Sequence, residues 1–145
     1  MRVRLRQFGI GAAILALAAS CTSSPTAPTV TPAFTQTEII IGLGDPAETG
    51  DLLNVRYVGW LYDPSKSDFK GPQFDASNPA QSPFQFRLGS GQVIAGWDQG
   101  LVGIRVGGSR RLVIPPSLAY DGERHGLIPP NESLVFDVEL VSISE

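Results

Sequence analysis

The stretch SGQVIAGWDQGL, residues 90–101, places Trp97 in a short apolar run with Gly96 before it and Gly100 shortly after it. A buried indole packs densely and needs a partner for its N–H group, yet both glycines remove side-chain bulk from the same segment. Another part of the molecule or a ligand must therefore cover Trp97. Which of the two covers it decides whether this segment is core or binding site.

The residues of the common catalytic and metal sites are largely missing. His125 is the only histidine and Cys21 the only cysteine, which argues against a metal site of several histidines or thiolates and excludes an intramolecular disulfide. The sequence contains no GxSxG, GxxxxGK[ST] or GxGxxG motif, so hydrolysis and phosphate binding are disfavoured. We therefore expect neither a metal nor a cofactor.

Large apolar and aromatic residues at predicted strand ends and in loops are the remaining candidates: Tyr57, Phe74, Phe84, Val93, Ile94, Trp97, Tyr120, Ile128 and Phe136. Each of them, taken alone, is also a reasonable core residue. However, Phe74 is followed by the carboxylate of Asp75, and Tyr120 and the run 127–130 fall in a loop region, where core packing is less expected. The set therefore fits a binding pocket as well as a core.

Period-two patterns predict antiparallel strands over residues 55–62, 83–88, 110–114 and 134–140. Only residues 93–101 have helical spacing, with Ile94, Trp97 and Leu101 on one face. One short helix and one sheet with a wet face predict an α+β fold, in which the helix packs against the apolar side of the sheet. A curved sheet around so short a helix leaves room for a cleft at the helix's N-terminal end.

The N-terminus has the pattern of an export signal. Three arginines precede an apolar stretch of about a dozen residues and then small residues before Cys21. The stretch is shorter than the ~20 residues that a spanning helix needs. The spacing resembles a bacterial lipobox, with Ala18 where leucine is more common, which implies a lipid anchor on Cys21; ordinary cleavage that leaves a free thiol is the alternative. Thr22 after the cysteine favours the outer membrane, facing the periplasm, if the organism has one, and the cell surface otherwise.

Three segments follow from this composition. Residues 1–21 form the predicted signal peptide, residues 22–37 a Ser/Thr/Pro-rich tether, and residues 38–145 the folded domain. Cleavage removes three arginines and no acid, which leaves eight basic and fourteen acidic residues. A net charge of about −6 makes nucleic acid an unexpected partner. We expect a monomer.

Six segments of the predicted domain resemble the FKBP-type peptidyl-prolyl cis-trans isomerases, in that family's order and near its spacing. They are VRYVGWL, QFDAS, PFQFRLG, QVIAGWDQGL, the region from VGGSRRLVIPPSLAY to HGLIPPN, and LVFDVEL. The similarity covers essentially residues 38–145. It implies a bent antiparallel β-sheet wrapped around one short α-helix, which agrees with the α+β fold expected from the patterns.

The resemblance also implies a role for each candidate residue. Trp97 would be the floor of an apolar pocket for the substrate's proline ring. Tyr57, Phe84 and Phe136 would form its walls, and Val93 and Ile94 its rim, where the Ile94 N–H would donate to a bound carbonyl. Phe74 and Asp75 would occupy the family's Phe-Asp positions, and the Tyr120 hydroxyl would meet a bound carbonyl. A loop containing His125 and Ile128 would overhang the site.

Two departures from the family's pattern concern the same pocket. The arginine that partners the pocket aspartate would fall at Ala80, so the network around Asp75 is expected to be incomplete. Tyr120 is followed by Asp121 where glycine is usual, and the following loop is one residue short. These changes affect loop geometry and substrate preference more than the reaction.

The expected function is peptidyl-prolyl cis-trans isomerisation of exported proteins, with proline-containing polypeptides as partners and macrolide FKBP ligands as inhibitors. Rotation about a peptide bond needs no nucleophile, and a dry aromatic pocket favours the less polar, twisted amide. Two alternatives remain at this point. One is a non-catalytic chaperone module that binds prolyl segments, and the other is a structural lipoprotein whose core fills the site.

Overall fold

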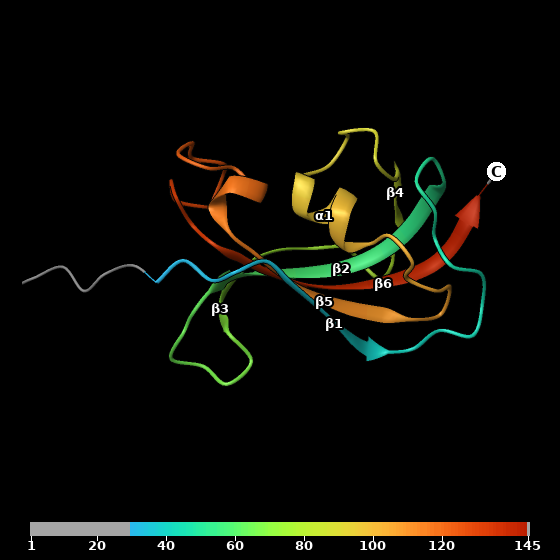
Figure 1. Ribbon diagram of the computed structural model, residues 1–145, viewed down its shortest axis with the longest axis horizontal. Helices are drawn as coiled ribbons and strands as arrows, with labels where there is room; N and C mark the ends of the chain where they lie inside the picture. Colours follow the sequence, from blue (N-terminus) through green and yellow to red (C-terminus); the bar gives the residue numbers. More distant parts are fainter. Residues whose placement is uncertain (1–29, 145) are drawn as a thin grey trace, which may run out of the picture.

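The computed structural model describes residues 30–144, so Cys21, the predicted signal peptide and residues 22–29 of the predicted tether lie outside the described residues. A six-stranded antiparallel sheet has the order β1-β5-β6-β2-β3, and β4 pairs with β2 off this path (Figure 1). In chain order the elements are β1 (Thr35–Ile40), β2 (Leu52–Tyr62), β3 (Lys70–Ala76), β4 (Phe84–Arg87), α1 (Ala95–Gly100), β5 (Ser109–Ile114), the 3-10 turn η1 (Pro116–Leu118) and β6 (Leu134–Ser144). No helix within the described range is long and apolar enough to span a bilayer.

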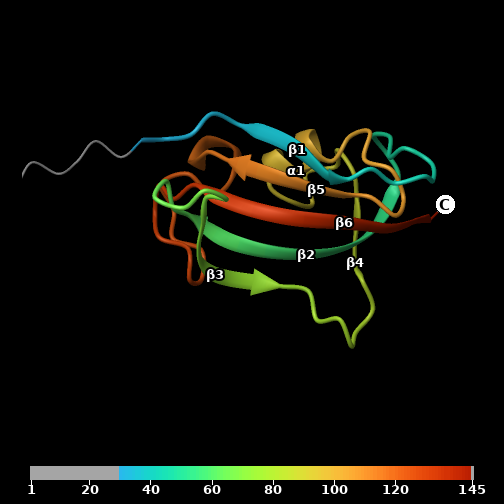
Figure 2. The ribbon, with the colours of Figure 1, turned by 90° about the horizontal axis from the view of Figure 1, so that it is seen from below.

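The sheet curves, and α1 lies against one of its faces (Figures 1 and 2). Strands β2, β5 and β6 supply most of the fully buried side chains on this face, among them Val55, Leu112, Ile114, Leu134 and Val138. In β2, and in β6 from Phe136 onward, they alternate with more exposed neighbours, which explains why the sequence pattern identifies these strands. The predicted α+β architecture, a bent antiparallel sheet around one short helix, is confirmed.

The helix approaches the sheet closely because two of its six residues are glycines. A Cβ atom on Gly96 would lie 2.6 Å from Ile114 Cγ2, and one on Gly100 would lie 2.6 Å from Leu112 Cδ2. Both distances are too short for a real side chain, so only glycine allows this packing. The glycines around Trp97 therefore make room for β5, while the indole itself points elsewhere.

Two strands, β1 and β3, were not expected from the sequence. They are the sheet's two edges, where one face or both faces meet solvent, so the apolar alternation of a strand is absent. β1 begins at Thr35, three residues before the predicted boundary at Glu38, and Phe34 packs against the core. The folded part therefore begins inside the segment predicted as tether. β3 contains Gly71 and Pro72, residues that weaken or interrupt a central strand but are tolerated at an edge.

The basic pair on β5 joins separate parts of the fold. Arg110 is only 7% exposed; its guanidinium pairs with Glu38 of β1 and donates to the carbonyls of Gly100 and Val102, at 2.7 and 2.9 Å. On the opposite face, Arg111 Nε lies 2.7 Å from Asp137 Oδ1. Arg110 thus connects the edge strand to the C-terminal end of α1.

Candidate functional site

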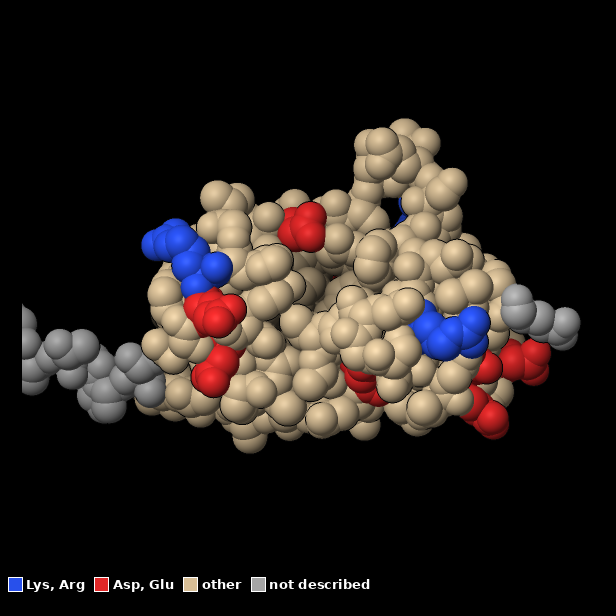
Figure 3. All heavy atoms as spheres, turned by 90° about the horizontal axis from the view of Figure 1, so that it is seen from above, with Lys and Arg blue, Asp and Glu red and all other residues tan. Residues whose placement is uncertain are grey.

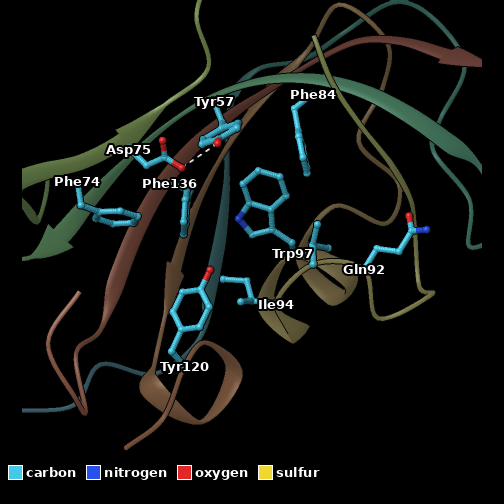
Figure 4. Close-up of a pocket in the computed structure, with 10 residues that line it drawn as sticks. Tyr57, Phe74, Asp75, Phe84, Gln92, Ile94, Trp97, Tyr120 and Phe136 are labelled. Carbon is cyan, nitrogen blue, oxygen red and sulfur yellow. Dashed lines mark hydrogen bonds between the residues drawn. The ribbon is translucent and has the colours of Figure 1, made fainter. Parts of the chain in front are cut away.

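A cavity of about 170 Å³ opens at the N-terminal end of α1, where the sequence predicted a cleft. Seen from above, the face that carries α1 is hollowed near its centre and mostly uncharged (Figure 3). Strands β2, β3, β4 and β6, the loop before α1 and the turn after η1 all contribute to the wall (Figure 4). The lining residues are Tyr57, Phe74, Asp75, Phe84, Gln92, Val93, Ile94, Trp97, Tyr120 and Phe136. Nine of these were predicted as site residues; Gln92 was not.

Trp97 forms the inner surface of this cavity and is 4% exposed. Three rings meet it nearly at right angles: Tyr57 at 5.1 Å, Phe136 at 5.2 Å and Phe84 at 6.2 Å between ring centroids. Its Nε1 atom is buried without a hydrogen-bond partner among residues 30–144. The protein therefore covers the sides of the indole, and the cavity borders the surface that remains.

The spacing of the walls depends on a glycine opposite Phe136. Gly59 of β2 pairs with Phe136 of β6 and with Asp75 of β3. A Cβ atom at Gly59 would lie 2.7 Å from Phe136 Cε1 and 2.8 Å from Phe74 Cζ. The absence of a side chain at Gly59 lets these two rings meet edge to face, 5.5 Å apart, at the edge of the cavity.

Tyr57 and Asp75 form the polar part of the wall. The Tyr57 hydroxyl donates to Asp75 Oδ2 at 2.8 Å, and the Ala76 N–H donates to Oδ1, also at 2.8 Å. Burial, the hydrogen bond to Asp75 and the charge of that carboxylate raise the pKa of Tyr57 to about 12. Tyr57 is therefore a neutral hydrogen-bond donor throughout the physiological range.

No cation partners Asp75 within the described part of the chain. Ala80, where the resemblance would place an arginine, is exposed in the turn between β3 and β4, and its N–H donates to Asn78 Oδ1 at 2.9 Å. The structure thus agrees with the expected incomplete network. Asp75 is held by neutral groups only.

Tyr120 closes the cavity on the side opposite β3, with its hydroxyl directed inward (Figure 4). Burial and the charge of Asp75 raise the pKa of this hydroxyl. The His125 ring stacks on Tyr120, with centroids 4.0 Å apart and an interplanar angle of 5°. The stack restricts the orientation of the phenol ring.

The places expected for His125 and Ile128 are corrected by the structure, because neither residue lines the cavity. Ile128 is 3% exposed and belongs to the core, while exposed His125 packs behind Tyr120. Reciprocal backbone hydrogen bonds of 2.9 and 3.1 Å join the two residues. His125 thus contacts the ring of Tyr120, and neither residue of this turn forms part of the cavity wall. Sequence spacing could not distinguish these arrangements, since both require an apolar residue in a loop.

The backbone before and after the cavity is held by local hydrogen bonds. Asp98 accepts from the N–H groups of Gly89 and Gly91, at 2.8 and 3.0 Å, which fixes the loop between β4 and α1. Ile94, at the N-cap of α1, lines the cavity. After Tyr120, Asp121 has a φ of 48°, in the region that glycine adopts most easily and aspartate tolerates. The substitution at Asp121 is thus accommodated with a left-handed backbone.

Comparison with known proteins covers the whole of this site. A model of the FKBP-type peptidyl-prolyl cis-trans isomerase family matches residues 44–141. FK506-binding protein 1 of Aspergillus oryzae is 40% identical over 106 residues, which cover 71% of this chain and 91% of that protein. FK506-binding protein 2B of Rhizopus delemar is 52% identical over 99 residues, 67% of this chain but only 44% of that protein. The crystal structure of a peptidyl-prolyl cis-trans isomerase from Pseudomonas syringae pv. tomato matches with a TM-score of 0.63 and 40% identity, over 77% of this chain and 76% of that chain.

Proposed function

The chain belongs to the FKBP-type peptidyl-prolyl cis-trans isomerases, and on this premise we propose that it turns X–Pro bonds of exported proteins in the cavity above Trp97. One observation carries the proposed place of the reaction: an open cavity of about 170 Å³ with aromatic walls and a single hydrogen-bonded tyrosine–carboxylate pair. The side chains of residues 30–144 leave the cavity open, which disfavours a purely structural role. Family membership disfavours a binding module without turnover.

The reaction needs little from the protein beyond surroundings and orientation. Rotation about a peptide bond crosses a barrier of ~18–20 kcal/mol because the amide loses its resonance. The twisted amide is less polar than the planar one, so a cavity that excludes water stabilises the transition state relative to the ground state. In the proposal the proline ring lies over Trp97, between Tyr57, Phe84 and Phe136, which replace the water around the bond.

Polar groups at the rim then orient the flanking peptide. The Tyr120 hydroxyl and the Ile94 N–H donate to substrate carbonyls, and Asp75, held by Tyr57, adds a negative charge beside the rotating bond. Phe74 and Val93 complete the apolar surround. A 1000-fold acceleration requires about 4 kcal/mol of transition-state stabilisation, which a few oriented contacts can supply.

We also propose that the chain is exported and anchored by acylation of Cys21, so that its substrates are exported polypeptides. The N-terminal pattern and the lipobox-like spacing support this proposal. Incorporation of radiolabelled palmitate into the wild type, and its absence in Cys21→Ala, is the expected result. Label in neither protein would overturn the anchor while leaving the isomerase unaffected.

The site is tested by a protease-coupled isomerisation assay on X–Pro peptides with residues 22–145. Trp97→Leu is expected to lower kcat/KM more than tenfold. Trp60→Phe is the matched control, because Trp60 lies on the other face of β2 beneath Lys70 and does not line the cavity. Circular dichroism checks that both variants fold. Equal activity of Trp97→Leu and wild type would refute the proposed site.

Ligand binding gives a second readout that does not depend on turnover. The two relatives above are named for FK506 binding, and we propose that this cavity binds the same class of macrolide. In a Trp60→Phe background, Trp97 is the only tryptophan, so its fluorescence reports the cavity alone. A saturable change on addition of FK506 is expected, and no change at micromolar ligand would contradict the proposal.

A further inference from the structure

Asp75 is the one carboxylate among the ten residues that line the cavity, and the lining contains no lysine, arginine or histidine. The others are aromatic, aliphatic or, in Gln92, a neutral amide. Asp75 is solvent-exposed, so its carboxylate lies at the mouth of the cavity and not in its interior. Any charge selection at the entrance must therefore come mainly from this residue.

No basic residue of the described range, residues 30–144, pairs with Asp75. Both of its oxygens accept hydrogen bonds from neutral donors, the Tyr57 hydroxyl and the Ala76 N–H. The ion pairs of the described chain involve two other acids: Glu38 pairs with Arg110, and Asp137 pairs with Arg111 and Lys70. Asp75 has none, so its remaining lone pairs face the solvent that an entering peptide displaces.

The field of this carboxylate extends across the cavity. After burial, the charge of Asp75 is a cause of the raised pKa of Tyr120, which lies on the opposite side. The same charge contributes to the raised pKa of Tyr57. A cationic side chain entering between these hydroxyls would be attracted, and an anionic one would be repelled.

We infer that this isomerase prefers prolyl segments with lysine or arginine immediately before the proline, and that Asp75 is the specificity-determining residue. The inference rests on the proposed function, in which the proline ring lies over Trp97 and the rotating bond lies beside Asp75. The residue before the proline is then joined directly to that bond. A lysine or arginine side chain at this residue is long enough to reach the exposed carboxylate of Asp75.

The size of the effect follows from the exposure of Asp75. Ion pairs in contact with solvent contribute little, and the preference is expected to be about two- to fivefold in kcat/KM at low ionic strength. Salt screens such pairs, so the preference falls toward unity at 1 M NaCl, where the screening length is ~3 Å. An apolar contact with the lysine stem would not have this salt dependence.

The test compares succinyl-Ala-X-Pro-Phe-p-nitroanilide peptides in which X is lysine, norleucine or glutamate. Norleucine keeps most of the aliphatic stem of lysine and lacks its ammonium group, so the lysine-to-norleucine ratio of kcat/KM isolates the charge. The wild type is expected to give the order lysine, norleucine, glutamate, with the ratio declining as salt is added. Asp75→Asn is expected to bring the ratio to one, whatever it does to absolute activity.

Glu139→Gln is the matched control, because it removes the same charge from the exposed outer face of β6. It should keep the wild-type ratio. A wild-type ratio of one, or a ratio that survives Asp75→Asn, would overturn the inference even if norleucine peptides are isomerised normally. Absence of turnover on every peptide would instead refute the proposed function, so the two failures are distinguishable.

Discussion

Gly59→Ala is the sharpest test of the idea that ring positions set the activity. The added methyl group would lie 2.7 Å from Phe136 Cε1 and 2.8 Å from Phe74 Cζ, where ordinary contacts begin at 3.4 Å. Each ring must therefore move by 0.6–0.7 Å or the strands must separate. Overpacking of this kind costs about 1–3 kcal/mol, and the reduced entropy of the unfolded chain returns about 0.4–1 kcal/mol. The expected net loss of unfolding free energy is about 1–2 kcal/mol.

The same shift displaces two walls of the cavity, so kcat/KM should fall about tenfold or more. Urea unfolding measures the first quantity and the protease-coupled assay the second. Gly122→Ala is the control, because its Cβ would meet only Asn131 Oδ1, at 3.8 Å. It should change the unfolding free energy by less than about 0.5 kcal/mol. If Gly59→Ala retained wild-type activity while losing stability, the link between wall position and catalysis would be refuted.

Three further changes separate the site from its scaffold. Tyr57→Phe keeps the ring contacts and removes the donor to Asp75, so kcat/KM should fall severalfold while the unfolding free energy changes by less than about 1.5 kcal/mol. Unchanged kcat/KM, or a larger loss of unfolding free energy, would contradict this prediction. Arg110→Met leaves Glu38 and two carbonyls without their donor, and chemical denaturation should show a loss of about 2–4 kcal/mol, against no loss if the network is dispensable. For Asp137, burial opposes ionisation, but hydrogen bonds from its two basic partners outweigh burial and lower its pKa. Its contribution is therefore complete above the unfolded pKa of about 4 and is lost as the pH falls through the lower folded value. In Asp137→Asn, the unfolding free energy should therefore decrease less steeply as the pH falls below about 4 than in the wild type. An unchanged pH dependence would contradict the role of this ion pair.

The central strands could be predicted from sequence because burial on one face creates a pattern. In β6, the fully buried Val138 and Leu140 alternate with the more exposed Asp137, Glu139 and Val141, and nothing but a half-buried strand needs that order. β1 offers no such pattern, since all six of its residues are exposed. Its threonines resemble the tether before it, and its pairing with β5 becomes visible only in three dimensions.

The site residues likewise differ in how far the sequence could place them. Residues on β2, β3, β4, β6 and α1 lie around one cavity, as the family resemblance implied. Spacing alone did not place those on β3, because this edge strand has no apolar alternation. The positions of His125 and Ile128 could not be predicted, because their side-chain directions depend on turns that spacing does not determine. Ile128 turned inward to the core, and His125 took a place behind Tyr120. Gln92 gave no sequence signal at all, as a single amide before a helix is unremarkable in composition.

The two glycines beside Trp97 link the packing of the helix on the sheet to the shape of the site. Without side chains at Gly96 and Gly100, α1 sits directly on β5, and this depth lowers the indole into the group of rings formed by Tyr57, Phe84 and Phe136. A larger residue at either glycine would lift the helix and open the bottom of the cavity to water. The dry surroundings that favour a twisted amide therefore depend on helix–sheet distance as much as on the aromatic residues themselves. The isomerase site is thus prepared by backbone packing before any substrate arrives.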